Sequence, residues 1–500
     1  MCVAQVETSE EYAKRVAKAK DLHRSFPLMK TLWSESDEVR QLTEVLLEQV
    51  RTVKARKRFK KDSYENNLIV LIGNLVKAYT YDNMWVAYSR SPRGYRDAQR
   101  YNPANVSRNM AQLTTDLVEL GYLRQEIGTE VGFQKYCSRG KATSKLLALW
   151  KSYGITYDLF HEHPESELLL LKNFKTKQPL YVDYEETSET QAMRNNLIEI
   201  NNYIEKQNIS LNISDDTFEE MIKGMEEKEE KKKGFISCRA KVAFDRIRLK
   251  RIFNNCTFNH GGRFYHAWWL EVPKEYRKHI TINGHETREI DYSTLHPSIL
   301  YAWKGLSTPT APYGISGYGK RLRPAIKLAM LIMLNANSRQ ATLKAIRNKL
   351  KDTFEEFEDS QMVRKLHDAI KKTHAPIAEY FNSGIGVELQ RIDSDIAERV
   401  MMRLNGLRPT VALPVHDSFI VPAYAEEFAK QVMLEEFERE LKQTTQVDSK
   451  IDKKTKAIRN ELKSGTLRIP TTLDIGSMID SGDSRWIWEI DMEEGEGMAI

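Results

Sequence analysis

Residues 412–422 constrain the fold of this chain more than any other stretch. They read Ala-Leu-Pro-Val, then His416-Asp417-Ser418, then Phe-Ile-Val-Pro. Apolar residues on both sides of one short polar step are typical of two buried strands joined by a tight turn. The sequence therefore predicts a buried hairpin that carries His-Asp-Ser at its tip.

A second stretch, residues 288–302, places another carboxylate at the end of a strand. Ile290 and Tyr292 favour a strand, and Pro297 opens an apolar run with helical spacing that ends near Lys304. Asp291 therefore falls where the strand gives way to a helix. A carboxylate there is either an exposed turn residue or, with a neighbouring backbone carbonyl, a ligand for a hard cation.

The two stretches together suggest a site that neither implies alone. If the two strand ends lie side by side, Asp291 and Asp417 form a pair of carboxylates. Two divalent ions about 3.5–4 Å apart can stabilise the attacking and the leaving oxygen of a phosphoryl transfer. We therefore expect these two aspartates to be metal ligands.

Length and composition set the class of protein. A chain of 500 residues with 41% apolar content exceeds what one core usually encloses, so two to four domains are expected. Its four cysteines are far apart and form no Cys-x-x-Cys pair, which argues against structural zinc and disulfides. We see no signal-peptide core and no run of 18 apolar residues, and we expect a cytoplasmic protein without a membrane partner.

The N-terminal half contains a pattern that resembles a winged-helix module. Residues 1–62 are expected to be a charged helical region, and residues 63–150 the winged helix. Asn105 can cap a helix that ends at Gly121, and two short strands follow it. The polar residues of this helix that could reach DNA are Ser107, Arg108, Gln112 and Thr115. Winged helices also mediate protein contacts, so this alternative stays open.

Three further elements carry candidate binding residues. Gly261-Gly262-Arg263 is a turn whose guanidinium suits a phosphate. A long helix is expected from Pro324 toward Leu350, and a second from near Gly386 that carries Gln390. The first of these helices begins with a cationic cluster that either binds a triphosphate or faces water, formed by Arg321, Arg323 and Lys327.

These elements occur in the order that family A DNA polymerases use, and residues 250–440 resemble that family. The resemblance implies that Asp291 and Asp417 bind the metals and that the Tyr292 carbonyl assists. It implies that Arg323 and Lys327 hold the incoming triphosphate, with Lys327 as the acid for pyrophosphate departure. It also implies nucleic-acid contacts, made by Arg263, Gln390 and His416 and, in the winged helix, by Arg108 and Gln112.

The implied fold is of the α/β (α+β) class. A right-hand polymerase unit of palm, fingers and thumb with an antiparallel palm sheet would follow the mainly α winged-helix domain. Residues 151–250 would be a connector with thumb-like helices, residues 251–445 the palm and fingers, and residues 446–500 a basic linker with an acidic tail.

The implied activity is template-directed DNA synthesis without a proofreading exonuclease. The cofactor would be Mg²⁺, as two ions, with Mn²⁺ as a substitute. The partners would be a DNA primer–template and deoxynucleoside triphosphates.

Three departures from the family pattern keep alternatives open. Leu331 and Asn335 stand where the fingers helix should carry an aromatic residue and a tyrosine, near the nucleotide. With Ser418, the motif reads His-Asp-Ser, which resembles that of the single-subunit phage-type RNA polymerases. An RNA polymerase or primase is therefore an alternative. His296 stands at the position that excludes ribose, which favours deoxynucleotides. A catalytically silent replication initiator or DNA-binding regulator is the alternative from another class.

Overall fold

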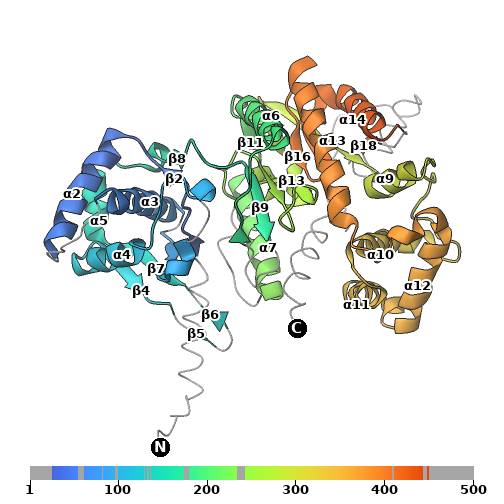
Figure 1. The fold of residues 1–500 in the computed structure, drawn as a ribbon, viewed down its shortest axis with the longest axis horizontal. Helices are drawn as coiled ribbons and strands as arrows, with labels where there is room; N and C mark the ends of the chain where they lie inside the picture. Colours follow the sequence, from blue (N-terminus) through green and yellow to red (C-terminus); the bar gives the residue numbers. More distant parts are fainter. Residues whose placement is uncertain are drawn as a thin grey trace, which may run out of the picture. The chain divides into compact units, whose positions relative to one another are not determined.

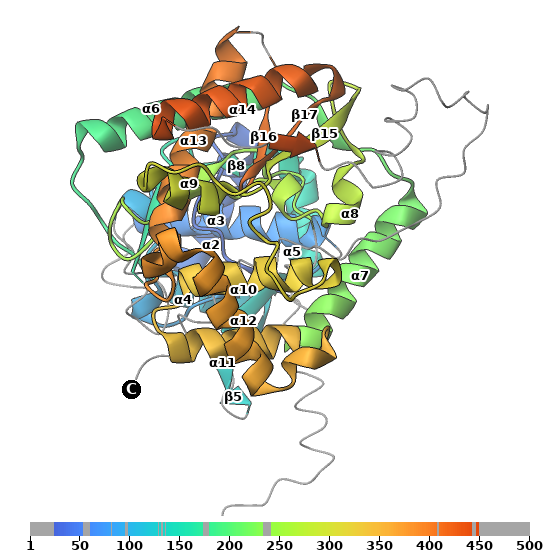
Figure 2. The same cartoon turned by 90° about the vertical axis from the view of Figure 1, so that its right-hand side faces the viewer.

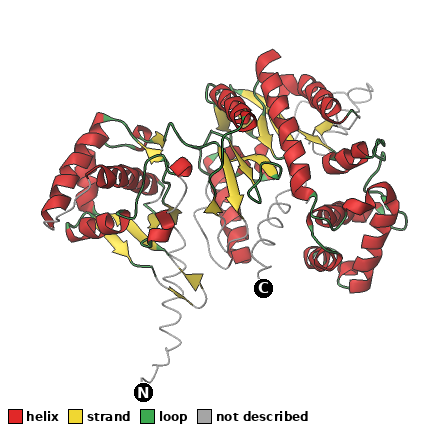
Figure 3. Ribbon diagram, in the orientation of Figure 1, coloured by secondary structure: helices red, strands yellow, loops and turns green. Residues whose placement is uncertain are grey.

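The computed structural model describes residues 25–53, 61–81, 83–95, 99–128, 130–131, 134–135, 137–173, 180–233, 242–407, 410–442 and 447–449. Most of the expected tail at 446–500 and the first 24 residues lie outside this set. The chain divides into two units, each with helices and strands (Figure 3). Unit 1 comprises residues 1–167, 181–183 and 215–242, and unit 2 the remainder.

Unit 1 is mainly helical with a small sheet. The apolar core residues of its helices recur at helical spacing, and its sheet has the strand order β1-β3-β7-β4. Its principal elements are β1 (Ser25–Pro27), α2 (Asp37–Val53), α3 (Lys61–Thr80), β3 (Trp85–Tyr88), α4 (Met110–Glu119), β4 (Leu123–Glu126), β7 (Ser138–Ala142), α5 (Ser144–Ser152) and α7 (Asp215–Lys233).

The expected helix-and-hairpin pattern is present in unit 1, with one correction. Strands β4 and β7 pair as an antiparallel hairpin after α4, as the sequence predicted. The helix begins at Met110 and not at Asn105, which adopts a left-handed φ of 51° and therefore cannot continue into the helix. The segment 106–109 is held instead by Asn67, whose side chain accepts from the Ser107 backbone N–H.

Unit 2 is built on an antiparallel sheet with the order β11-β14-β15-β17-β16, and β18 pairs with the far end of β15. This confirms the antiparallel sheet that was expected. The sheet strands are β11 (Ile209–Leu211), β14 (Ile280–Ile282), β15 (His285–Tyr292), β16 (Leu413–Val415), β17 (Ser418–Pro422) and β18 (Val447–Ser449).

One face of this sheet packs on a helix, and the other face carries both polar and buried apolar residues. Ile290 and Phe419 are paired and fully buried, and the Tyr292 hydroxyl donates to the Met433 carbonyl of α14 (Glu426–Leu441) at 2.7 Å. Helix α14 lies beside β15 and β17 (Figure 2). Residues one position away, including Asp291, therefore point to the opposite face.

Besides α14, the α-helices described in unit 2 are α6 (Ser188–Ile204), α8 (Lys274–Arg277), α9 (Leu295–Trp303), α10 (Arg323–Asn335), α11 (Arg339–Leu350), α12 (Ser360–Thr373) and α13 (Gly386–Leu407) (Figure 1; α8 is labelled in Figure 2). The single long helix expected from Pro324 to Leu350 is wrong, because the chain breaks into α10 and α11. Ser338 accepts a hydrogen bond from the Ala341 N–H and so caps a new helix.

The segment expected as one connector and thumb, residues 151–250, is shared between the two units, since α6 lies in unit 2 and α7 in unit 1. Within the described residues, every helix is too short or too polar to cross a lipid bilayer.

A hairpin of strands β12 (Lys250–Phe253) and β13 (Gly261–Tyr265) carries Arg263, and β12 also pairs with β9 (Leu169–Asn173). Gly262 has φ of 86°, and a β-carbon there would lie 2.7 Å from Phe253 Cε1 and 2.9 Å from Ser394 Oγ. The turn expected at Gly261-Gly262-Arg263 is therefore wrong, because these residues belong to β13, and the close contacts of Gly262 are made with β12 and α13.

Gly262→Ala is expected to lower the free energy of unfolding by about 2–4 kcal/mol, because left-handed strain adds to overpacking. Gly284→Ala is the matched control: its φ is 78° in the β14–β15 turn, but nothing lies within 4 Å of an added β-carbon. Strain alone should cost about 1–2 kcal/mol there. Urea midpoints compare the two variants, and equal losses would contradict the packing argument.

Candidate functional site

The two predicted carboxylates lie on neighbouring strands at the same end of the sheet. Asp291 of β15 is paired with Ser418, the first residue of β17, so Asp417 lies one residue beyond that pair. The hairpin predicted from 412–422 is confirmed, with a two-residue loop of His416 and Asp417. The strand register thus brings together two residues that are 126 positions apart (417 − 291).

His416 adopts a conformation that non-glycine residues rarely use. Its φ is 62°, the value that a two-residue hairpin loop requires at its first position when the strands twist normally. A residue other than glycine, asparagine or aspartate costs about 1–2 kcal/mol there. Backbone strain of this kind is concentrated at functional sites.

A third carboxylate, Glu289, lies on the same face of β15. Ser418 is fully buried and donates to Glu289 Oε1 at 2.8 Å, and Arg277 Nη1 lies 3.5 Å from the same oxygen. The expectation that Ser418 is part of the polar tip is therefore wrong. Its hydroxyl ties β17 to β15 directly beside Asp291.

Tyr313 links the two aspartates to the cationic helix. Its ring is 5% exposed, and Arg323 Cζ and Lys327 Nζ lie 5.5 and 5.9 Å from the ring centroid. Burial raises the pKa of the Tyr313 hydroxyl, Asp417 and Asp291 raise it further, and Arg323 opposes them. The strand register sets Asp291 beside Asp417, and the charges of both carboxylates contribute to this shift of the pKa.

The segment that carries Tyr313 is anchored by a buried histidine. His374 Nε2 lies 2.7 Å from the Pro312 carbonyl, and Nδ1 lies 3.0 Å from the Tyr301 hydroxyl. A carbonyl only accepts, so Nε2 carries the hydrogen and Nδ1 accepts from the tyrosine. Burial lowers the pKa of His374, which favours this neutral form.

The predicted cationic cluster is divided. Arg323 and Lys327 of α10 both lie over Tyr313. Arg321, just before the helix, forms an ion pair with Glu356 instead. Two of the three cations therefore lie over the ring of Tyr313.

Leu331 and Asn335 occupy the later turns of α10. Leu331 is half-buried, and its carbonyl accepts from Asn335 Nδ2 at 3.1 Å. Asn335 Oδ1 is buried and has no hydrogen-bond partner among the described residues. A β-carbon added at Gly386 would overlap this oxygen, so Asn335 packs on the start of α13.

Arg263, expected at the nucleic-acid backbone, and His296, expected beside the sugar, both bind a residue that sequence reasoning missed. Arg263 Nε lies 3.0 Å from Asp393 Oδ1, and His296 Nε2 lies 2.8 Å from Asp393 Oδ2. Burial opposes the charge on Arg263, but Asp393 outweighs burial and the pKa of the guanidinium is raised, with a further contribution from Asp417.

Gln390 begins the same helical face as Asp393, three residues earlier on α13, and it is buried. This spacing is the signal that could have identified Asp393, because residues three apart share one helical face. Tyr313 had no such signal, since it lies in a loop.

The winged-helix candidates lie in unit 1 at the start of α4. Arg108 is exposed, and Gln112 Nε2 donates to Asp116 Oδ1 at 2.9 Å. Ser107 Oγ lies 2.8 Å from Ser63 Oγ, and Thr115 accepts from Arg90 at 3.1 Å. Among these four residues, only Arg108 has an exposed side chain.

The oxygen atoms of Asp291 and Asp417 are candidate ligands for magnesium. Among the described residues, no group of three or more histidine, cysteine, aspartate or glutamate side chains could hold a metal ion. Mg²⁺ is usually bound by one or two carboxylates, with waters and substrate phosphates as its other ligands. Asp291 and Asp417, with the Tyr292 carbonyl, fit that pattern, because the nucleotide would complete the ligand set.

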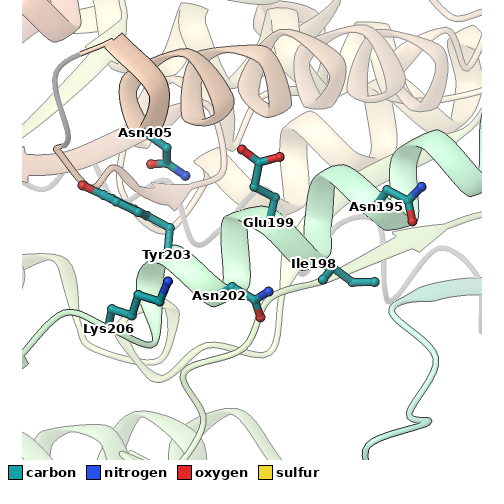
Figure 4. Close-up of a pocket in the computed structure, with 7 residues that line it drawn as sticks. All are labelled: Asn195, Ile198, Glu199, Asn202, Tyr203, Lys206 and Asn405. Atoms are coloured by element: carbon teal, nitrogen blue, oxygen red, sulfur yellow. The ribbon is translucent and has the colours of Figure 1, made fainter.

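An open pocket elsewhere in unit 2 contains none of these residues. It lies along α6 and near the end of α13, and Figure 4 shows amide side chains on its wall. The lining residues are Asn195, Ile198, Glu199, Asn202, Tyr203, Lys206 and Asn405.

Comparison with known proteins adds no name to this site. No protein-family model matches the chain, and no curated protein matches it. Function is therefore inferred from the sequence motifs and from the residues around Tyr313.

Proposed function

We propose that the chain is a template-directed nucleotidyltransferase, most specifically a DNA-directed DNA polymerase. The observation that carries the proposal is the strand register that sets Asp291 beside Asp417, together with the two cations, Arg323 and Lys327, that lie over the ring of Tyr313. Carboxylates beside two cations suit a reaction in which metal ions and a triphosphate meet. An ordinary surface ion pair has one acidic and one basic side chain, so it does not explain a pair of carboxylates together with a pair of cations.

In the proposed reaction the primer 3′-hydroxyl loses its proton to water and its oxygen forms a bond to the α-phosphorus. The bond from that phosphorus to the bridging oxygen of the β-phosphate breaks, and pyrophosphate leaves. Asp291 and Asp417 would hold Mg²⁺, which supplies Lewis-acid stabilisation of the phosphate charge when bound. Arg323 would hold the triphosphate, and the Lys327 ammonium would give a proton to the departing pyrophosphate.

A second candidate within the same chemistry is an RNA polymerase or primase. Ser418, where the DNA polymerases have a glutamate, favours it. The expected result is extension of a primed DNA template with labelled deoxynucleotides in Mg²⁺, with little product from ribonucleotides or unprimed templates. Preferred use of ribonucleotides would favour the RNA polymerase, and no product with either would favour the silent DNA-binding regulator.

A further inference from the structure

A buried array of three side chains lies next to the proposed catalytic aspartates. Asp393 of α13 is 1% exposed, Arg263 of β13 is 6% exposed and His296 of α9 is 11% exposed. Arg263 contacts both Asp393 oxygens, and its Nη2 lies 3.3 Å from His296 Nε2. Asp393 is 130 positions from Arg263 and 97 positions from His296 in the sequence. Three distant segments thus meet at the Asp393 carboxylate.

The hydrogen-bond roles in this array follow from the charge on Asp393. Burial opposes that charge, but Arg263 and the bond from His296 outweigh burial, and the pKa of Asp393 is lowered. An ionised carboxylate only accepts, so His296 Nε2 carries a hydrogen and donates it to Asp393. Arg263 Nη2 is also a donor, so the two groups share Oδ2.

This assignment fixes the histidine ring. A charge-assisted bond to a buried carboxylate is stronger than a neutral bond, so His296 loses a good partner if its ring turns. His296 follows Asp291 by five residues and lies in the first turn of α9. The junction of β15 with α9 therefore joins this array to Asp291, and the charge of Asp417 helps to raise the pKa of Arg263.

We propose that Asp393 is a positioning residue for sugar selectivity: it holds the His296 ring where the 2′-hydroxyl of a ribonucleotide would lie. The inference rests on the proposed nucleotidyl transfer and adds to it a residue and a role. A ring held by a buried carboxylate cannot swing away to admit an extra oxygen. A ring released from Asp393 can do so.

The test measures kcat/KM for a deoxynucleotide and for the matching ribonucleotide on one primed template. Asp393→Asn keeps the shape and removes the charge, so the preference for the deoxynucleotide should fall about tenfold to a hundredfold, the range for one small steric contact. His296→Ala should lower the preference at least as far. In the double variant, Asp393→Asn should add nothing to the loss caused by His296→Ala.

Glu398→Gln provides a matched control. Glu398 is a buried carboxylate of the same helix that lies 2.5 Å from the fully buried Arg251, and within the described residues it also accepts from Asn196. Its substitution should perturb stability without changing the ratio of the two kcat/KM values. The ratio therefore separates a role in positioning His296 from a general loss of folding.

Two results would overturn the inference. One is a wild-type ratio in Asp393→Asn, and the other is a further loss in the double variant equal to that in Asp393→Asn alone. If Asp393→Asn does not fold, His296→Phe, which keeps a ring but cannot donate to Asp393, should lose at least several-fold of the preference. An unchanged preference in His296→Phe would also overturn it. A wild-type chain that adds neither nucleotide instead contradicts the proposed function itself.

Discussion

Asp291→Ala and Asp417→Ala are each expected to lower the rate of nucleotide addition by at least about a thousandfold, because metal-ion stabilisation of phosphoryl transfer is worth several kcal/mol. Because Asp291 pairs with Ser418, Asp291 and Asp417 are neighbours, and in the proposed site each supplies its own oxygen to the metal ions. The remaining carboxylate is therefore not expected to compensate for the missing one. Single-turnover extension of a labelled primer measures the effect.

DNA binding should behave differently in the same variants. A carboxylate repels the phosphate backbone, so its removal should leave affinity for a primer–template unchanged or slightly higher. Anisotropy of a labelled duplex, at one stated salt concentration, measures this affinity. Loss of binding and extension together would indicate misfolding and not a missing metal ligand.

Glu286→Ala is the matched control for both aspartates. Glu286 is a carboxylate of the same strand, exposed and 3.6 Å from Arg288, at the other end of β15. Its removal should leave extension within about twofold, as for a surface ion pair. If both aspartate variants extend the primer as fast as the wild-type chain does, the proposed metal site is wrong.

The sequence predicted those parts of the site that depend on local patterns. Apolar runs around His416-Asp417 predicted the hairpin, and the strand-to-helix change after Asp291 predicted the junction of β15 with α9. In both places the periodicity of apolar residues sets the element, and the polar residue is left at its end. The strand register then sets Asp291 beside Asp417, because β15 and β17 must bury the same face against α14.

The parts that depend on distant partners were not predictable in this way. Asp393 reads as one more polar residue of an amphipathic helix until Arg263, 130 positions earlier, is packed against it. Tyr313 lies in a loop whose position depends on His374, 62 positions beyond Pro312. Such contacts are set by the tertiary fold, and a single sequence carries no periodic signal for them.

The break between α10 and α11 shows a third limit. Apolar spacing continues across Asn335-Ala336-Asn337-Ser338, so periodicity alone predicts one helix. The local hydrogen bond from the Ala341 N–H to Ser338 competes with helix continuation and ends that reading. The consequence is that Asn335 sits at a helix end, against Gly386, and not in the middle of a helix.

Arg323→Ala and Lys327→Ala are each expected to lower kcat/KM for the nucleotide by about tenfold to a hundredfold, because one hydrogen bond to a charged group is worth about 1.5–3 kcal/mol. Both cations lie over the Tyr313 ring. Removal of Arg323 should appear mainly in KM, since in the proposed reaction this residue would bind the triphosphate throughout. Removal of Lys327 should also lower kcat, since its proton is needed only when pyrophosphate leaves.

Arg321→Ala separates this interpretation from a general effect of positive charge at the start of α10. Arg321 is two residues from Arg323, but it forms an ion pair with Glu356 and is exposed. If net charge alone attracts the nucleotide, all three variants should raise KM to a similar extent, and the effect should shrink as salt is added. If geometry around Tyr313 matters, Arg321→Ala should stay within about twofold of the wild-type chain. Steady-state extension at saturating primer–template, with the nucleotide concentration varied at two salt concentrations, distinguishes the two outcomes. Salt screens exposed side chains such as Arg321 more than cations that contact the nucleotide beside the buried Tyr313 ring.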